Sequence, residues 1–146
     1  MNDERELVNA TALYLDSLFG EGAGTKHSAF LERLENDHLR EMIHRYHSLE
    51  GDTRELSVAD NYLIGLAVLC ATKSYGTAGM FAKTLLHLGV RREKILEVLA
   101  RLAMWVGGLH AVEATLHVQK ALTEYETQGL AAMAAWFPAP SARESR

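Results

Sequence analysis

The chain of 146 residues contains little proline and few β-branched residues. Its two prolines, Pro138 and Pro140, lie in the last nine residues, so proline interrupts no helix before them. The sequence contains only 8 Val and 3 Ile but 22 Leu and 20 Ala, and leucine and alanine are strong helix formers. This composition disfavours a β-sandwich or a doubly wound sheet. The length suits one domain, and we predict an all-α fold.

Several kinds of segment are also missing. No apolar run approaches the roughly 18 residues of a transmembrane helix, and the acidic residues 1–6 lack the features of a secretory signal. The only cysteine, Cys70, allows no internal disulfide and no multi-cysteine zinc site. A net charge of −4 without a basic arm disfavours nucleic-acid binding. We therefore expect a cytoplasmic protein with no membrane or nucleic-acid partner, no metal and no cofactor.

One segment of the chain lacks acidic residues altogether. Residues 1–60 hold 13 acidic and 6 basic residues, whereas residues 61–92 hold no Asp or Glu. The charged residues of that second segment are Lys73, Lys83, Arg91 and Arg92. An apolar and purely cationic segment can attract a carboxylate ligand. A buried helical hairpin whose few charges are positive by chance produces the same pattern.

Helical periodicity extends through most of the sequence. The expected helices cover residues 4–19, 28–49, 58–73, 77–88, 92–106 and 109–128. The second should bend near Asn36, which can cap a new helix, so six or seven helices are predicted. Ser57 with Asp60 is typical of a capping box, and Gly89 of a left-handed helix end. We expect residues 1–137 to form the domain and residues 138–146 a flexible tail.

Four short motifs follow one another in the second half of the chain. They are Leu-Ser at 56–57, Leu-Gly-Val at 88–90, Ile-Leu-Glu-Val-Leu at 95–99 and Trp-Val-Gly at 105–107. In this order and spacing they resemble the carboxymuconolactone decarboxylase family, which shares its fold with the alkylhydroperoxidase D-like proteins. The resemblance covers about residues 56–115. It implies an all-helical subunit that assembles as a homotrimer or homohexamer.

The catalytic motif of that family is absent. Peroxidase members carry Cys-x-x-Cys and a His three residues later, and the places counted back from Leu-Gly-Val hold Tyr75, Ala78 and Phe81 here. Decarboxylase members use the same His. Thiol peroxidase chemistry needs a thiolate and a resolving partner. We therefore expect no thiol peroxidase activity, and we expect Cys70 to be a buried small hydrophobic residue.

The side chain of Phe81 is expected on the core-facing side of its helix. It shares one helical stripe with Ala78, Leu85 and Leu88. The inherited site is therefore either plugged by the aromatic ring or remade as the wall of an apolar pocket.

Glu97, Arg101 and Trp105 are a first candidate for chemistry. Their spacing of i, i+4 and i+8 places a carboxylate, a guanidinium and an aromatic ring on one side of a helix. Such a carboxylate can orient a substrate or move a proton. A surface ion pair worth roughly 0.3–0.5 kcal/mol is the alternative interpretation.

Two further candidates lie on neighbouring helices. Tyr75, near Lys73 and Lys83 in sequence, can donate a proton to an oxyanion, although a core tyrosine fits the pattern too. The residues His110, Glu113 and His117 share a helix face, but the two histidines are roughly 10 Å apart along the axis, too far to bind one metal ion. A solvated polar face is therefore expected there. His110 stands out because it follows the glycine pair at 107–108, where the family's chain bends into its cavity.

Taken together, the sequence predicts an acid–base enzyme without a redox cofactor that acts on a small anionic organic substrate by decarboxylation, isomerisation or cyclisation. The predicted catalytic residues are Tyr75, Glu97 and His110. The predicted substrate-binding residues are Phe81, Lys83, Arg101 and Trp105. The alternative is a non-catalytic ligand-binding or assembly member of the same fold. Convergence of Tyr75 with Glu97 or His110 would favour the enzyme, and a core filled by Phe81 would favour the alternative.

Overall fold

The structure is a computed structural model that describes residues 2–136, and all regular structure in this range is helical. The helices are α1 (Asn2–Phe19), α2 (Ala23–Glu32), α3 (Asp37–Gly51), α4 (Val58–Ala71), α5 (Tyr75–His87), α6 (Arg92–Val106), α7 (Gly108–Gln128) and the 3-10 helix η1 (Gly129–Trp136). The predicted all-α class is confirmed. The expected tail lies outside the described residues.

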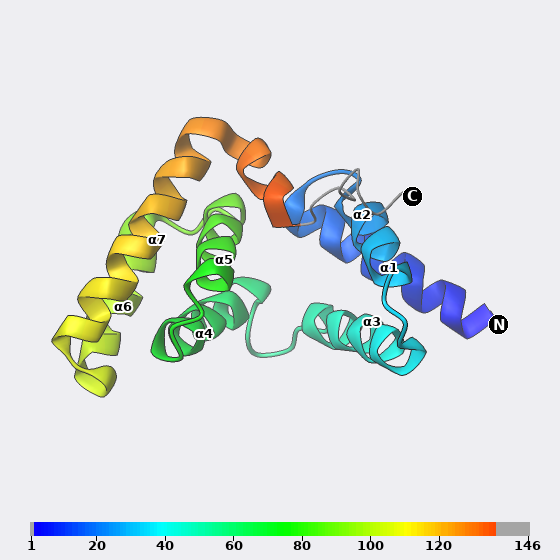
Figure 1. The fold of residues 1–146 in the computed structure, drawn as a ribbon, viewed down its shortest axis with the longest axis horizontal. Helices are drawn as coiled ribbons and strands as arrows, with labels where there is room; N and C mark the ends of the chain where they lie inside the picture. The colour runs from blue at the N-terminus through cyan, green and yellow to red at the C-terminus, as the bar shows by residue number, and fades with distance from the viewer. Residues whose placement is uncertain (1, 137–146) are drawn as a thin grey trace.

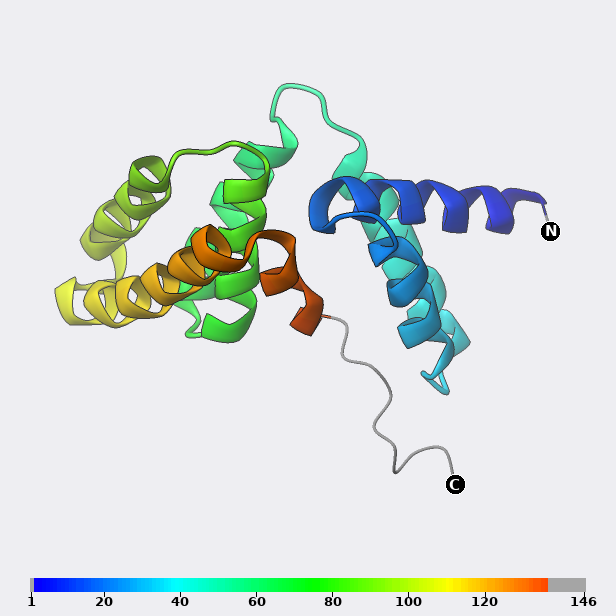
Figure 2. The same ribbon diagram turned by 90° about the horizontal axis from the view of Figure 1, so that it is seen from above.

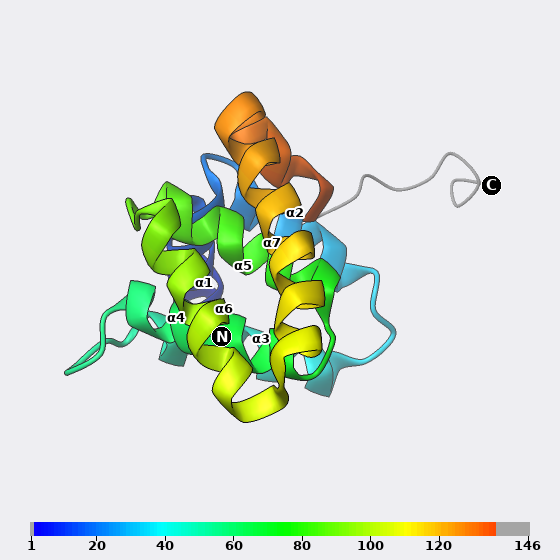
Figure 3. The same cartoon turned by 90° about the vertical axis from the view of Figure 1, so that its left-hand side faces the viewer.

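The helices fall into two groups (Figure 1). Helices α4 to α7 pack against one another, with α5 against α4 and α7, and α6 against α7. Helices α1 to α3 form the second group and lie beside the first in the view from above (Figure 2). The contacts of α1 with α5 and of α3 with α4 join the two groups. Figure 3 shows α6 and α7 side by side as an antiparallel hairpin.

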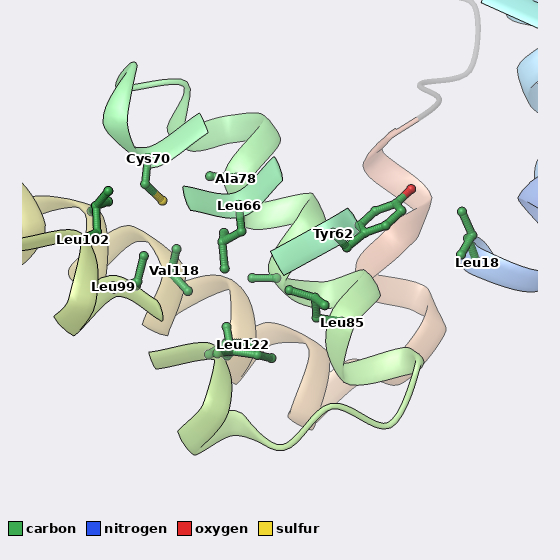
Figure 4. Packing of buried hydrophobic residues seen from close by; sticks show 13 residues of the cluster. Leu18, Tyr62, Leu66, Cys70, Ala78, Leu85, Leu99, Leu102, Val118 and Leu122 are labelled. Carbon is green, nitrogen blue, oxygen red and sulfur yellow. The ribbon is translucent and has the colours of Figure 1, made fainter. Parts of the chain in front are cut away.

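The main hydrophobic core lies between α4, α5, α6 and α7 (Figure 4). Leu66, Leu85, Leu99 and Leu122 have no exposed surface and come from four different helices. On α5, Ala78 and Leu85 are buried in this core, and Phe81 and Leu88 pack against it. The apolar stripe expected on that helix therefore faces the core.

The ends of several helices follow from residues adjacent in the chain. The Ser57 side chain accepts a hydrogen bond from Asp60 N, and the Asp60 carboxylate accepts one from Ser57 N, which completes the predicted capping box. Asn36 caps α3, as its side chain accepts a hydrogen bond from Leu39 N. Gly89 ends α5 with φ +82°, the left-handed conformation that glycine adopts without strain.

The start of α2 differs from the prediction, which placed it at residue 28. Helix α2 begins at Ala23, directly after a turn in which Gly20 and Gly22 have positive φ. The Asp16 carboxylate of α1 accepts a hydrogen bond from Gly24 N at 2.8 Å and so supplies the cap that α2 lacks locally. Gly24 also lies so close to α1 that an added Cβ would be 2.3 Å from Cα of Ala12. The packing of α2 against α1 therefore requires glycine at position 24.

Candidate functional site

The turn between α4 and α5 has an unusual backbone. Lys73 has φ +61° and is the only non-glycine residue with positive φ among those described. Its N–H donates to the carbonyl of Cys70, and Ser74 N donates to the carbonyl of Leu69. This pattern is a helix end in which glycine is the usual residue. A residue with a side chain in this conformation costs roughly 1 kcal/mol relative to glycine. The turn brings Lys73 and Tyr75 toward α7.

Tyr75 meets the first half of α7. Its ring stacks on the imidazole of His117 with centroids 4.4 Å apart and planes 12° apart. The phenol oxygen is buried and has no hydrogen-bond partner among the described residues. Burial, and then the nearby Glu113 carboxylate, raise the pKa of Tyr75. The phenol is therefore neutral at physiological pH and holds a proton that it can donate.

Other charged and polar groups also join α7 to the α4–α5 turn. Lys73 Nζ lies 3.8 Å from Glu113 Oε2. His110 Nε2 lies 2.8 Å from the Cys70 carbonyl oxygen, and because a carbonyl only accepts, Nε2 carries the proton that it donates. The two α7 histidines and Glu113 thus face the α4–α5 turn. We call Lys73, Tyr75, His110, Glu113 and His117 the polar cluster.

The polar cluster contains two of the three residues predicted to be catalytic, Tyr75 and His110, without a hydrogen bond between them. Glu113 and His117 are exposed, in agreement with the solvated face expected there, and they also contact Lys73 and Tyr75. Their shared helix face was visible in the sequence. The packing of the α4–α5 turn against that face was not.

The predicted residues of α6 lie on another surface. Glu97, Arg101 and Trp105 line a groove of about 340 Å³ between α4 and α6. Arg101 donates to Glu97 Oε1 at 3.1 Å, and both side chains are largely exposed. The remaining lining residues are Ala67, Lys94, Val98 and Leu102. The groove shares no residue with the polar cluster, so Glu97 and Tyr75 do not form one site.

The remaining two predicted residues have structural partners. The ring of Phe81 packs on Tyr62 with centroids 4.5 Å apart, and a Cβ added to Gly65 would lie 2.5 Å from it. This ring therefore fills space between α4 and α5. The Lys83 side chain is buried, with its ammonium 2.8 Å from a carboxylate oxygen of Glu124 and 3.1 Å from the carbonyl oxygen of Ala132. Both bonds hold α5 to the C-terminal part of the described chain.

Cys70 is buried in the core as a free cysteine. Burial raises its pKa to about 11, so the residue is a thiol at neutral pH rather than the reactive thiolate.

Among the described residues, no three His, Cys, Asp or Glu side chains are grouped as a metal ion would require. Within the same part of the chain, no helix combines the length and hydrophobicity needed to cross a membrane.

Comparison with known proteins identifies no relative of this chain. No family model, no curated protein and no solved structure matches the chain. The structure establishes a single-domain all-α helical bundle. Membership of the carboxymuconolactone decarboxylase family stays a prediction from the sequence motifs.

Proposed function

We propose that the protein is a carboxymuconolactone decarboxylase-like acid–base enzyme that uses the polar cluster to act on a small anionic organic substrate. The observation that carries this proposal is the phenol of Tyr75, whose oxygen is buried beside His117 and Glu113 and has no hydrogen-bond partner within residues 2–136. A buried donor left unsatisfied costs roughly 1–3 kcal/mol. A substrate oxygen that accepts this hydrogen bond would offset that cost.

Each member of the polar cluster has a role in such chemistry. The carboxylate of Glu113 removes a proton from a carbon next to a carbonyl group, and the phenol of Tyr75 donates its hydrogen bond to the resulting enolate oxygen. The ammonium of Lys73 attracts a substrate carboxylate. The imidazole of His117 orients the phenol by stacking.

Proton exchange in D₂O tests the proposal. We expect the protein to catalyse C–H to C–D exchange or CO₂ release, followed by NMR, in at least one member of a panel of small carboxylic acids that carry a ketone or lactone carbonyl. Tyr75→Phe and Glu113→Gln should lower that rate about 10-fold or more while the unfolding temperature stays the same. His38→Gln, which changes an exposed histidine of α3, is the matched control. Equal rates in all four proteins would contradict the assignment of the site.

The packing of Phe81 favours a second candidate function. Because its ring fills space between α4 and α5, the place that the family resemblance assigns to the catalytic His is occupied by core. A non-catalytic ligand-binding or assembly protein of the same fold is consistent with this. Absence of turnover over the whole panel would favour this candidate over the enzyme.

A further inference from the structure

Helix α3 packs on the rest of the chain mainly with polar residues. None of its 15 residues is buried. The half-buried residues of α3 are Arg40, Ile43, His44, His47 and Glu50. Its other apolar residues are exposed, and Leu49 has an exposed fraction of 71%. Because apolar burial is the dominant stabilising term in packing, α3 depends on its polar contacts to stay in place.

The segments that flank α3 contain no buried residue. Residues 33–36 connect α3 to α2, and residues 52–57 connect it to α4. A hydrogen bond of 3.3 Å from Thr11 Oγ1 to the carbonyl oxygen of His44 ties α3 to α1. One such bond contributes only about 1 kcal/mol. The position of α3 is therefore sensitive to a change of charge at its contacts.

Three histidines lie at the contact between α2 and α3. The ring of His27 on α2 is buried, with its centroid 4.9 Å from that of His47 and 6.1 Å from that of His44 on α3. Burial, and then His47 and His44, lower the pKa of His27 to about 4. Like charges at these distances repel one another strongly where water is largely excluded. Protonation of His27 therefore opposes the contact that now buries it.

Other titratable groups around the histidines come from α1 and α3. The Glu50 carboxylate lies 3.2 Å from His47 Nδ1, so it balances a charge on that ring. Tyr14 of α1 is neutral, because burial and then Glu50 raise the pKa of its phenol. Asp16 of α1 accepts the hydrogen bond of Gly24 N at the start of α2.

The groove beside His44 adds further charges. Its charged lining residues are Glu32 of α2 and, on α3, Asp37, Arg40, Glu41 and Arg45. On α3, Arg40 pairs with Asp37 and Arg45 with Glu41. Of all the residue types around the contact, histidine alone ordinarily changes its charge between pH 5 and 8. Mild acid therefore adds positive charge there.

We propose that acid releases α3 from α1 and α2, through protonation of the histidines at their contact, while the α4–α7 group stays folded. Release opens the groove of about 890 Å³ between these three helices and uncovers Leu31 in its wall, which is 1% exposed. Within the described chain, no residue of α3 belongs to the main hydrophobic core. The polar cluster lies elsewhere, so release of α3 does not depend on the proposed enzymatic function.

The size of the response follows from the charge state of His27. In the packed form its pKa is about 4, and in the released form the ring returns to the ordinary value of 6.5. Protons therefore bind the released form more tightly, and acid favours release. From this residue alone, we expect the ratio of released to packed chains to rise about 60-fold between pH 7 and pH 4.5.

Distances between spin labels, measured by pulsed electron paramagnetic resonance, test the release. Ala29→Cys on α2 and Ser48→Cys on α3 are exposed labelling sites, and Cys70→Ala removes the native thiol. We expect this label pair to be farther apart at pH 4.5 than at pH 7. A second pair, Ala100→Cys on α6 and Thr123→Cys on α7, should keep its distance at both pH values.

Three histidine variants identify the group responsible. His27→Gln gains no charge in acid and should keep the pH 7 distance between α2 and α3 at pH 4.5. His38→Gln, at an exposed position of α3, is the matched control and should respond like the wild type. If His27→Gln does not fold, His47→Gln takes its place and should show a smaller released fraction than the wild type.

Three outcomes overturn the proposal. The first is a wild-type distance between α2 and α3 that is the same at both pH values. The second is an equal increase of that distance in the wild type and in the variant that lacks His27 or His47. The third is separation of the α6–α7 pair at the same pH, because the whole chain would then unfold rather than α3 alone.

Discussion

At the scale of single residues, two positions carry unusual structural demands. The aromatic ring of Phe81 packs between α4 and α5, and Lys73 has a strained backbone conformation at the turn before α5. Phe81 occupies the place of the catalytic His in the family resemblance, and Lys73 lies two residues before the place of the first Cys. Their effects on stability are measurable without knowledge of a substrate.

Replacement of Phe81 distinguishes a packed ring from a pocket wall. We expect Phe81→Ala to lower the free energy of unfolding by about 3 kcal/mol, because the ring leaves a cavity against Tyr62 and Gly65. Urea unfolding measures this loss, and Phe30→Ala, at a more exposed position of α2, should cost much less. A loss below about 1 kcal/mol for Phe81→Ala would show that the ring borders open space.

Relief of strain at Lys73 should stabilise the protein. In Lys73→Gly the left-handed conformation no longer carries a side chain, and we expect a gain of about 0.5–1 kcal/mol in the free energy of unfolding. The lost contact with Glu113 is exposed and contributes little. Thermal unfolding measures the gain. As a control, Lys120→Gly inside α7 should lower the free energy of unfolding by about 1 kcal/mol, because glycine destabilises a helix interior. Equal losses in the two variants would refute the strain at this turn.

At the scale of elements, α2 and α3 contact each other through three histidines. The imidazole of His27 on α2 is buried and lies 4.9 Å from that of His47 and 6.1 Å from that of His44, both on α3 (centroid distances). His47 in turn has its Nδ1 3.2 Å from Glu50 Oε2. Burial, then His47 and His44, lower the pKa of His27 from 6.5 to about 4. The contact between these helices therefore depends on a neutral His27.

Acid should weaken this contact. Between pH 6.5 and about 4 the unfolded chain protonates His27 and the folded chain does not, so stability falls as the pH falls and levels off below about 4. The loss for this group is about 3 kcal/mol at most. We expect His27→Gln to show a smaller difference in unfolding free energy between pH 7 and pH 4.5 than the wild type, by urea unfolding, and the exposed His38→Gln to match the wild type. The same difference in all three proteins would argue against a buried neutral His27.

At the scale of the whole molecule, the α4–α7 group carries two separate surfaces. The polar cluster lies on one of them and the groove between α4 and α6 on another. The buried Lys83 holds α5 to α7 and to the residues after it, so the predicted ligand-binding cation is engaged in holding the fold together.

The sequence alone determined the helices and most of their ends. The Ser57–Asp60 capping box, the Asn36 cap and the Gly89 helix end depend on residues within a few positions of one another, so local patterns predicted them. The start of α2 was missed because its cap, Asp16, and its close neighbour, Ala12, belong to another helix. Only the tertiary structure separated Glu97 from Tyr75, joined Tyr75 to His117 and left the apolar residues of α3 exposed. Periodicity defines which residues share a face of a helix, but the packing of distant helices decides what that face meets.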